Sequence, residues 1–346
     1  MNPIPDKAGR TVTALGIDLG GTRLKIGLVD RRGRVLAMKK FPTRVQIGRE
    51  PLIKRIIGLT ASFLKDPCCG AQPPRVIGLG AAGLIDIGRG VVELSPNFPD
   101  WRQVPLGPRL EEALGLATFL DNDANAVTFG EKWAGAGQDW EHFACLTLGT
   151  GVGGGLILGG RLWYGAHGSG PEIGHMTIAP RGELCRCGNR GCLETKASAT
   201  WLVEKANRII REKGLHPPCS LKSIKPGATL TAQDLFHWAQ TGETHMVRLF
   251  QQMGEALGLA LANLVHLLSL EGIILGGGLS RAATIFLPYL EKEFKKRLTL
   301  VSPAGVGLRI STLQERSGII GAAGLALERA GSDRTGYLKQ RFPDGP

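Results

Sequence analysis

The chain has 346 residues, of which 43% are hydrophobic and 21% charged, as expected of a soluble globular protein with room for two domains and a substantial core. The formal net charge is +12, but the densest basic runs, Arg31–Arg34 and Lys292–Arg297, are short and lack interleaved aromatic residues. The charge therefore predicts solvated faces and no nucleic-acid partner, although a positive field also suits a phosphorylated substrate.

No membrane-directed segment is expected. The first ten residues, MNPIPDKAGR, have no apolar core and do not form a signal peptide. The most apolar stretch, residues 256–278, contains Asn263, His266 and Glu271 and ends in glycines, which favours a buried helix and strand over a membrane span. The sequence thus predicts a cytoplasmic protein without a membrane partner, in a compartment where structural disulfides are rare.

The first third of the chain alternates predicted strands and helices. Its first three strands are separated by a GGT turn and an RRGR turn, the second of which closes a hairpin. The predicted elements are three strands within 11–41, strands within 75–85, 91–101 and 116–123, helices over 51–65 and 124–133, and a loop over 68–74.

The rest of the chain again contains a strand, a glycine turn and a strand, followed by further helices. Residues 141–163 again read as a buried strand, a glycine turn and a buried strand, which indicates two related halves. The further predicted elements are helices over 195–211, 246–268 and 317–330, a loop or small insertion over 217–229, and a strand, a triple glycine and a helix start within 272–280. The pattern is that of an α/β protein.

Three glycine turns follow predicted strands. In Asp18-Leu19-Gly20-Gly21-Thr22, two glycines expose backbone N–H groups and Thr22 adds a hydroxyl, as phosphate oxygens require, while Asp18 stands where a nucleotide's Mg²⁺ would sit. The turn at 149–151 is Gly-Thr-Gly, and the turn at 276–278 is a triple glycine between a predicted strand and a predicted helix. One such turn alone is more often only a tight turn. None of the three matches a P-loop, and the glycines that begin at 149 open a second strand, whereas a dinucleotide fingerprint opens a helix.

Asp123 follows a predicted buried strand and opens a predicted helix in LDNDANAVTFGE. An isolated aspartate at this position is by default an N-cap. The Asn122–Asp123 pair, however, lies at a strand end between two glycine turns, which favours a role beyond capping.

Three cysteines and one histidine follow the spacing H-x9-C-x-C-x4-C. Four such ligands suit a tetrahedral, structural Zn²⁺ site without an open position, whereas a redox pair is more often C-x-x-C. The remaining alternative is a set of unligated cytosolic thiols. The predicted zinc ligands are His175, Cys185, Cys187 and Cys192.

Together, the Asp18–Thr22 turn, Asn122–Ala126, Gly149-Thr150-Gly151 and the cysteine-rich stretch at 174–194 resemble the ROK family of sugar kinases and sugar-responsive repressors. The resemblance runs from about residue 14 to about residue 324, in family order. It implies a two-lobed actin-like ATPase or hexokinase (ribonuclease H-like) fold, with nucleotide and sugar in the interlobe cleft. Residues 1–121 would form the smaller lobe, with a C-terminal helix over 317–332 packing back on it, and residues 122–316 the larger, zinc-bearing lobe. The family favours homodimers.

The resemblance also implies ATP, Mg²⁺ and a structural Zn²⁺, and it makes Asp123 the general base for the sugar's 6-hydroxyl. The residues that would contact the sugar are Gly83, Asn97, Asn122, Glu172, His175 and Glu194. The residues that would bind the nucleotide and its phosphates are Asp18, Gly20, Gly21, Thr22, Thr150, Gly151, Gly277 and Gly278. His175 would have one ring nitrogen on zinc and the other on a sugar hydroxyl. Without the resemblance, Glu172 and Glu194 read as surface charge.

The resemblance is greatest to the family's glucokinases, and we expect ATP-dependent phosphorylation of the 6-hydroxyl of an aldohexose, glucose first. This chain has Ala81-Ala82-Gly83 where many relatives have a proline before the glycine, which leaves the exact hexose open. The alternatives are an N-acetylhexosamine or fructose kinase, polyphosphate as phosphate donor, and a non-catalytic sugar-responsive regulator. The family's repressors carry an N-terminal helix-turn-helix, and only about ten residues precede the first predicted strand here.

Overall fold

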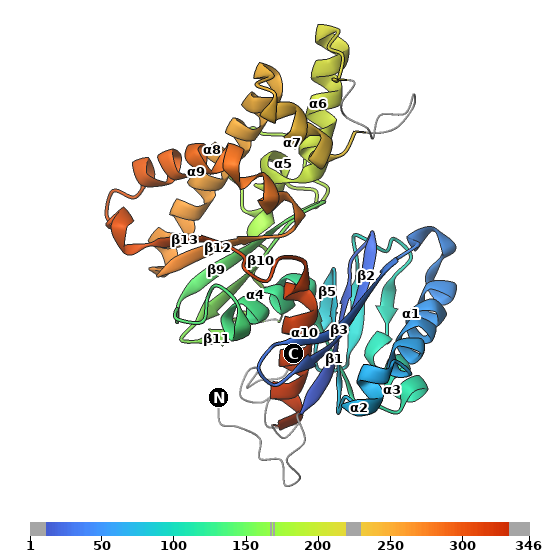
Figure 1. The fold of residues 1–346 in the computed structure, drawn as a ribbon. Helices are drawn as coiled ribbons and strands as arrows, with labels where there is room; N and C mark the ends of the chain where they lie inside the picture. The colour runs from blue at the N-terminus through green and yellow to red at the C-terminus, as the bar shows by residue number, and fades with distance from the viewer. Residues whose placement is uncertain (1–11, 167, 169, 219–229, 332–346) are drawn as a thin grey trace. The chain divides into compact units, whose positions relative to one another are not determined.

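The computed structural model describes residues 12–166, 168, 170–218 and 230–331. The chain divides into two compact units, and it passes from one to the other after residues 141, 154, 171 and 310. The first unit holds the residues up to 141, residues 155–171 and those from 311 onward, and the second holds 142–154 and 172–310 (Figure 1).

The first unit is built on a five-stranded sheet of order β3-β2-β1-β4-β8, in which β1, β4 and β8 are parallel and β2 and β3 are antiparallel to their neighbours. A three-stranded sheet of order β5-β6-β7 stands beside it. The strands are β1 (Thr13–Leu19), β2 (Arg23–Asp30), β3 (Val35–Pro42), β4 (Ile77–Ala81), β5 (Leu84–Asp86), β6 (Val91–Leu94), β7 (Arg102–Val104), β8 (Thr118–Asn122) and β11 (Arg161–Leu162). The helices are α1 (Arg49–Leu64), α2 (Pro67–Ala71), α3 (Leu106–Leu114), α4 (Asp123–Ala134) and α10 (Ser317–Gly331), with short 3-10 turns at Val45–Ile47 and Gln314–Arg316.

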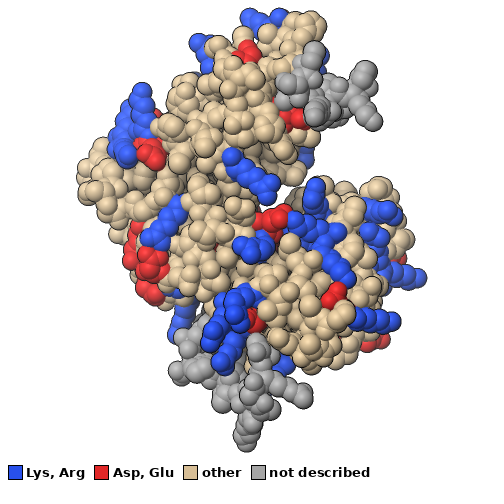
Figure 2. All heavy atoms as spheres, in the orientation of Figure 1, with Lys and Arg blue, Asp and Glu red and all other residues tan. Residues whose placement is uncertain are grey.

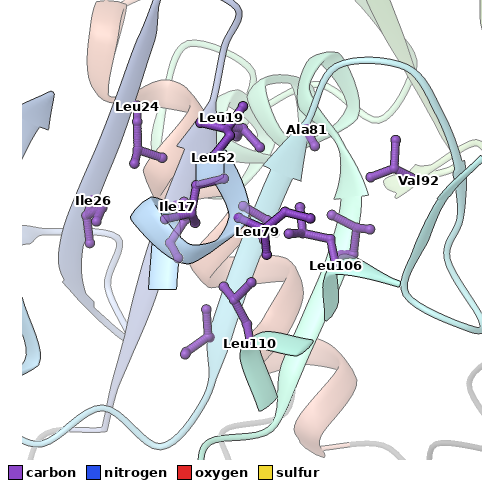
Figure 3. Packing of buried hydrophobic residues seen from close by; sticks show 14 of the residues in the cluster. Ile17, Leu19, Leu24, Ile26, Leu52, Leu79, Ala81, Val92, Leu106 and Leu110 are labelled. Atoms are coloured by element: carbon purple, nitrogen blue, oxygen red, sulfur yellow. The ribbon is translucent and has the colours of Figure 1, made fainter. Parts of the chain in front are cut away.

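Strand β1 is buried on both of its faces, to which successive side chains point in turn. Leu15, Ile17 and Leu19 of β1 belong to the cluster that includes α1 and α3, and Figure 3 shows Leu79 of β4 beside Leu52 of α1 and Leu106 of α3. Ala14, which precedes Leu15 and points to the opposite face, packs with α10 instead. The near-continuous apolar run of β1 thus reflects two covering layers.

Helix α10 approaches the sheet and α4 at backbone level. A Cβ atom built on Gly78 of β4 would lie 1.8 Å from the Ala322 carbonyl oxygen, and one on Gly16 of β1 would lie 1.9 Å from that of Ile319. On its other side, a Cβ on Gly321 would lie 1.6 Å from the Ala126 carbonyl oxygen in α4. Only glycine permits these contacts.

The second unit carries a parallel array in which β12 lies between β9 and β13. Its long helix α8 packs along α9, where Gly254 and Gly258 face the carbonyl oxygens of Phe286 and Leu290. The elements are β9 (Phe143–Leu148), β12 (Gly272–Gly276), β13 (Gly307–Ile310), α5 (Glu194–Ala197), α6 (Ala199–Lys213), α7 (Ala232–Gln240), α8 (Thr244–Leu268), α9 (Ala283–Arg297), and 3-10 turns at Ile173–His175, Gly278–Ala282 and Pro303–Gly305. Strand β10 (Val152–Leu158) crosses from this unit into the first, where it pairs with β11.

Most predicted elements are present, with three differences. The predicted loop over 68–74 is wrong, because Asp66 accepts the Cys68 N–H as an N-cap and Pro67 starts the short helix α2. The predicted helix over 195–211 breaks at Ser198, which caps α6 by accepting the Trp201 N–H. Helices α3 and α7 and strands β7 and β13 were not predicted, whereas the helix predicted to start within 272–280 begins as the 3-10 turn Gly278–Ala282 and continues as α9. Of the predicted insertion over 217–229, residues 219–229 lie outside the described part of the chain, as does residue 332 of the predicted C-terminal helix.

The division by packing places α4 in the first unit, because α4 and α10 are in extensive contact. The predicted lobes instead divide the chain at residue 121 and place α4 in the larger lobe. That assignment came from the family resemblance rather than from packing, and it stays a prediction.

Replacing Gly321 by alanine should destabilise the first unit, because the new methyl group has to push α10 away from the Ala126 carbonyl. We expect a loss of about 2–3 kcal/mol in the free energy of unfolding, measured by urea titration. Gly58→Ala in α1 is the matched control, since nothing lies within 4 Å of its added Cβ and alanine favours a helix by up to about 1 kcal/mol. Equal effects of the two variants would contradict the close approach.

Candidate active site

Three parallel strands of the first unit end together. The register pairs Leu19 of β1 with Ala81 of β4, and Ala81 with Asn122 of β8. The first glycine turn, the turn at Gly83 and the Asn122–Asp123 pair therefore leave the sheet at one edge. The carboxyl ends of parallel strands are where α/β proteins place their ligand sites.

Two hydrogen bonds hold the first glycine turn, residues 18–22, at its base. The Gly20 N–H donates to the Arg23 carbonyl over 3.0 Å, and the Thr43 hydroxyl donates to the Gly20 carbonyl over 2.7 Å. Gly20 and Gly21 are partly exposed and Thr22 is exposed, so their N–H groups and hydroxyl lie near the surface. A Cβ on Gly21 would stand 3.2 Å from the Asn97 side chain, which brings this predicted sugar contact beside the turn.

Lys25 belongs to this site and was not predicted from the sequence. It faces Asp18 across the antiparallel β1–β2 pair, and its Nζ lies 2.7 Å from Asp18 Oδ2. Both side chains are largely buried, with 18% and 17% exposed. The spacing of a hairpin register could have identified Lys25, because a cation opposite an aspartate at the mouth of a phosphate turn can also contact phosphate.

Asn122, rather than Asp123, caps helix α4. Its Oδ1 accepts the N–H groups of Ala124 at 2.8 Å and Asn125 at 3.2 Å, and its Nδ2 donates to the Gly83 carbonyl at 3.0 Å. Asp123 is the first helical residue, is half-buried, and accepts the Ala124 N–H at 2.9 Å. The default reading of Asp123 as an N-cap is therefore wrong. Its carboxylate lies at the positive end of the helix dipole, which favours the ionised form.

Gly83 and Asn97 are positioned by the small sheet. Gly83 has φ +126°, and a Cβ there would lie 2.2 Å from the Leu94 carbonyl oxygen, so the packing of β5 on β6 itself demands glycine. The Asn97 loop is anchored by the buried, stacked rings of Phe98 and Trp101, whose centroids lie 4.5 Å apart. Both residues stand in the same unit as Asp123.

The cysteine-rich loop of the second unit brings its four predicted ligands together. The ligand atoms of His175, Cys185, Cys187 and Cys192 all lie within 4.8 Å of one another. The Cys185 Sγ is 3.6 Å from His175 Nδ1, and Cys187 Sγ is 3.7 Å from Cys192 Sγ. A tetrahedral zinc with standard bond lengths separates its ligand atoms by about 3.6–3.8 Å. The four side chains therefore fit a Zn²⁺ ion.

The three thiols of the cluster differ in pKa. Burial raises the pKa of Cys192 to about 12 and raises that of Cys185, whereas the Asn189 backbone N–H lowers the pKa of Cys187. Thiolates are the metal-binding form, so an ion bound here would displace the thiol protons. No disulfide joins cysteines of the described residues.

His175 is oriented for two partners. Its Nδ1 faces the thiols, and its Nε2 lies 4.0 Å from Glu172 Oε2. The 3-10 turn Ile173–His175 fixes this orientation, because the His175 N–H donates to the Glu172 carbonyl. The Leu193 N–H donates to the Met176 carbonyl, so the chain after Cys192 is tied to the chain after His175. The cluster therefore fixes where Glu172 stands.

Glu194 was predicted as a sugar contact, and in the structure its carboxylate contacts the second glycine turn, residues 149–151. Its Oε2 accepts the Val152 N–H at 2.9 Å, and a Cβ on Gly151 would lie 2.3 Å from the same oxygen. The Thr200 hydroxyl donates to the Thr150 carbonyl at 2.7 Å. The turn is thus fastened to the segment that follows the cysteine cluster.

The third glycine turn lies against the second. Strands β9 and β12 are parallel, with Thr147 opposite Gly276, so the turns that follow them leave the sheet side by side. Gly277 has φ +82°, and a Cβ there would meet the Leu148 carbonyl oxygen at 2.3 Å. Gly278 has open space around it. Within the second unit, the predicted nucleotide residues Thr150, Gly151, Gly277 and Gly278 therefore gather at one sheet edge.

The surface adds two observations. On the face drawn in Figure 2, Lys and Arg side chains are spread over both units with acidic side chains among them. Within the described ranges, no helix has the length and apolar character needed to cross a membrane. The expected absence of a nucleic-acid partner stays a prediction.

Comparisons with family models, curated proteins and solved structures agree. The model of the ROK family matches residues 14–329. A glucokinase of Thermotoga maritima is 40% identical over 323 residues, which cover 92% of this chain and 98% of that protein. A ROK family glucokinase from Streptomyces griseus, solved with glucose and AMPPNP, superposes with a TM-score of 0.80 at 32% identity, covering 91% and 99% of the two chains. A ROK hexokinase from Thermus thermophilus superposes with a TM-score of 0.76 at 32% identity, covering 92% and 99%.

The cysteine cluster predicts one zinc ion per chain in the purified protein, measured by plasma mass spectrometry. Cys187→Ser should lower the zinc content well below one and lower the melting temperature, because a structural zinc contributes directly to folding. Cys68→Ser, which alters an exposed thiol outside the cluster, is the matched control and should keep its zinc. A metal-free wild-type protein that is fully folded would refute the zinc site.

Proposed function

The chain belongs to the ROK family, and from that membership we propose that it transfers the γ-phosphoryl group of ATP to the 6-hydroxyl of glucose, giving glucose 6-phosphate and ADP. Its fold is the two-lobed, actin-like hexokinase fold of the ROK glucokinases, as expected from the sequence. The observation that carries the proposal is the match to a glucokinase solved with glucose and AMPPNP over nearly the whole chain. The presence of Asp123 at the end of β8 supports a catalytic rather than a purely sensory member.

Asp123 is the proposed general base. Phosphoryl transfer passes through a loose transition state, so the enzyme mainly positions its reactants and neutralises charge. A carboxylate held ionised at the start of α4 needs only to orient the 6-hydroxyl and to accept its proton late in the reaction. Because Asn122 caps the helix, the carboxylate of Asp123 is not required for that task.

The two phosphate turns are the proposed cradle for ATP. Gly21 and Thr22 would offer N–H groups and a hydroxyl from the first unit, and Gly20 would shape the turn, because its own N–H is bonded to the Arg23 carbonyl. Thr150 and Gly151 would contribute from the second unit. Gly277 and Gly278 would lie beside the adenosine. Asp18 is an oxygen ligand of the kind that Mg²⁺ prefers, and this ion would neutralise charge on the phosphates of the bound nucleotide. Lys25 would supply a further positive charge to a phosphate oxygen.

The zinc loop is proposed to position sugar-binding groups rather than to take part in the chemistry. A ligand set of three cysteines and one histidine leaves a tetrahedral ion no open position. With Nδ1 on the metal, His175 would donate a hydrogen bond from Nε2 to a sugar hydroxyl, beside Glu172. Asn97, Asn122, Gly83 and Glu194 complete the proposed set of sugar contacts.

Cellular context forms part of the proposal. Reduced thiols and ATP are both maintained in the cytoplasm, so the enzyme would act there, in the first step of glucose breakdown. The homodimer expected from the resemblance stays a prediction.

Asp123→Asn should retain the fold and sugar binding and reduce kcat at least about 100-fold, because the amide keeps the shape but cannot accept the proton. The measurement is an ADP-release assay at saturating glucose and ATP, with glucose affinity followed by calorimetry. Asp66→Asn is the matched control in the same unit, since asparagine can still cap α2. A kcat near that of the wild type would remove Asp123 as the base.

The substrate is tested with ATP and Mg²⁺ against glucose, mannose, fructose, N-acetylglucosamine and N-acetylmannosamine, with polyphosphate as a second donor. We expect the highest kcat/KM for glucose with ATP. Turnover of an N-acetyl sugar alone would keep the reaction and change the substrate. Binding of a sugar without any turnover would favour a regulator.

A further inference from the structure

A buried polar network lies directly behind the Asn122–Asp123 pair. The Asp121 carboxylate, in β8, is 2% exposed, and it meets Arg329 near the end of α10 and Tyr164 after β11, which are each 4% exposed. All three residues belong to the first unit. They come from segments far apart in the sequence, so the network joins three elements at one point.

The two carboxylate oxygens of Asp121 accept hydrogen bonds from different partners. Oδ2 accepts the Tyr164 hydroxyl at 2.7 Å and a hydrogen bond from Arg329 Nη2. Oδ1 accepts the backbone N–H of Asn122 at 2.7 Å and Asn125 Nδ2 at 3.2 Å. The carboxylate is rigid, so whatever holds Oδ2 also sets where Oδ1 stands.

Arg329 also covers the free edge of the sheet. Strand β8 is the last in the order β3-β2-β1-β4-β8, and Arg329 Nη1 donates to the Leu120 carbonyl at 3.0 Å. Its Nη2 reaches the Tyr164 hydroxyl as well, at 2.9 Å. The Tyr164 hydroxyl therefore accepts a hydrogen bond from the Arg329 guanidinium and donates one to the Asp121 carboxylate. It thus links the two charged groups.

Stability alone is a poor explanation for this arrangement. A buried ion pair is often no more stabilising than apolar side chains of similar volume, because both charges lose their hydration. What hydrogen-bonded buried charges supply is a fixed geometry. The geometry fixed here is that of the Asn122 peptide, one residue before Asp123.

We propose that Asp121, Tyr164 and Arg329 are positioning residues that orient Asp123 through the Asn122 peptide. The inference rests on the proposed role of Asp123 as the general base. Asn122 is held at its backbone N–H by Asp121 and at its side chain by Ala124, Asn125 and Gly83. Loss of the hydrogen bond from the Asn122 N–H to Asp121 would let the first turn of α4 rotate. Small displacements of a catalytic group lower the reaction rate by large factors.

Tyr164→Phe is the decisive variant. It removes one donor from Asp121 but keeps the ring, the ion pair and the other three donors, so the protein still folds. Arg329→Met would leave a buried charge unpaired and is expected to unfold the unit. Tyr289→Phe on α9 in the second unit makes the same chemical change away from the network and is the control.

We expect Tyr164→Phe to lower kcat about tenfold, with the KM for ATP changed less than about twofold, whereas Tyr289→Phe keeps the wild-type kcat. In an Asp123→Asn background, Tyr164→Phe should cost nothing further, because the group that it positions is already disabled. Amide hydrogen exchange at residues 122–125 should speed up in Tyr164→Phe and not in the control.

Equal kcat losses in the wild-type and Asp123→Asn backgrounds would overturn the proposal, since the tyrosine would then act independently of the base. Unchanged hydrogen exchange at residues 122–125 would also overturn it, whatever the activity. If the wild-type protein phosphorylates none of the sugars, the proposed function fails, and the exchange measurement still decides whether the network restrains the start of α4.

Discussion

The first unit depends on the contact of α10 with the backbones of β1, β4 and α4. Gly16, Gly78 and Gly321 remove the side chains that would otherwise separate these elements, so carbonyl groups of one element meet Cα atoms of the next. Interfaces of this kind leave little freedom to slide. The strand ends that carry the first phosphate turn, Gly83 and Asp123 are therefore held at fixed mutual positions, and the proposed chemistry uses that rigidity.

Capping and catalysis are divided between neighbouring residues at the start of α4. Asn122 takes the helix N–H groups, while Asp123 stands one position later with its carboxylate in the same electrostatic field. A similar division occurs in the second unit. There the predicted zinc ligands gather in one loop, and the two glutamates proposed to bind sugar, Glu172 and Glu194, stand on either side of them, while His175 is proposed for both tasks.

The sequence predicted features whose signal is local. The four zinc ligands are close in the chain and chemically distinctive, and the strands of the first sheet are marked by apolar runs between glycines. Helix α2 was missed because its cap, Asp66-Pro67, precedes only five helical residues. Lys25 was missed although the β1–β2 hairpin register could have identified it. Arg329 could not be recognised, because its role arises from a contact with Asp121, which lies far away in the sequence. Glu194 was assigned to a sugar, and only the fold reveals its bond to the Val152 N–H.

The late position of α10 in the chain affects how the first unit folds during synthesis. Strand β1 emerges from the ribosome first, but the helix that covers one of its faces lies at residues 317–331. Most of the second unit, residues 172–310, is continuous in the chain and makes its contacts over shorter loops. During translation, the face of β1 that α10 covers therefore stays exposed until nearly the whole chain has been synthesised. Such delayed long-range closure slows folding and lengthens the period in which a nascent chain needs protection from aggregation.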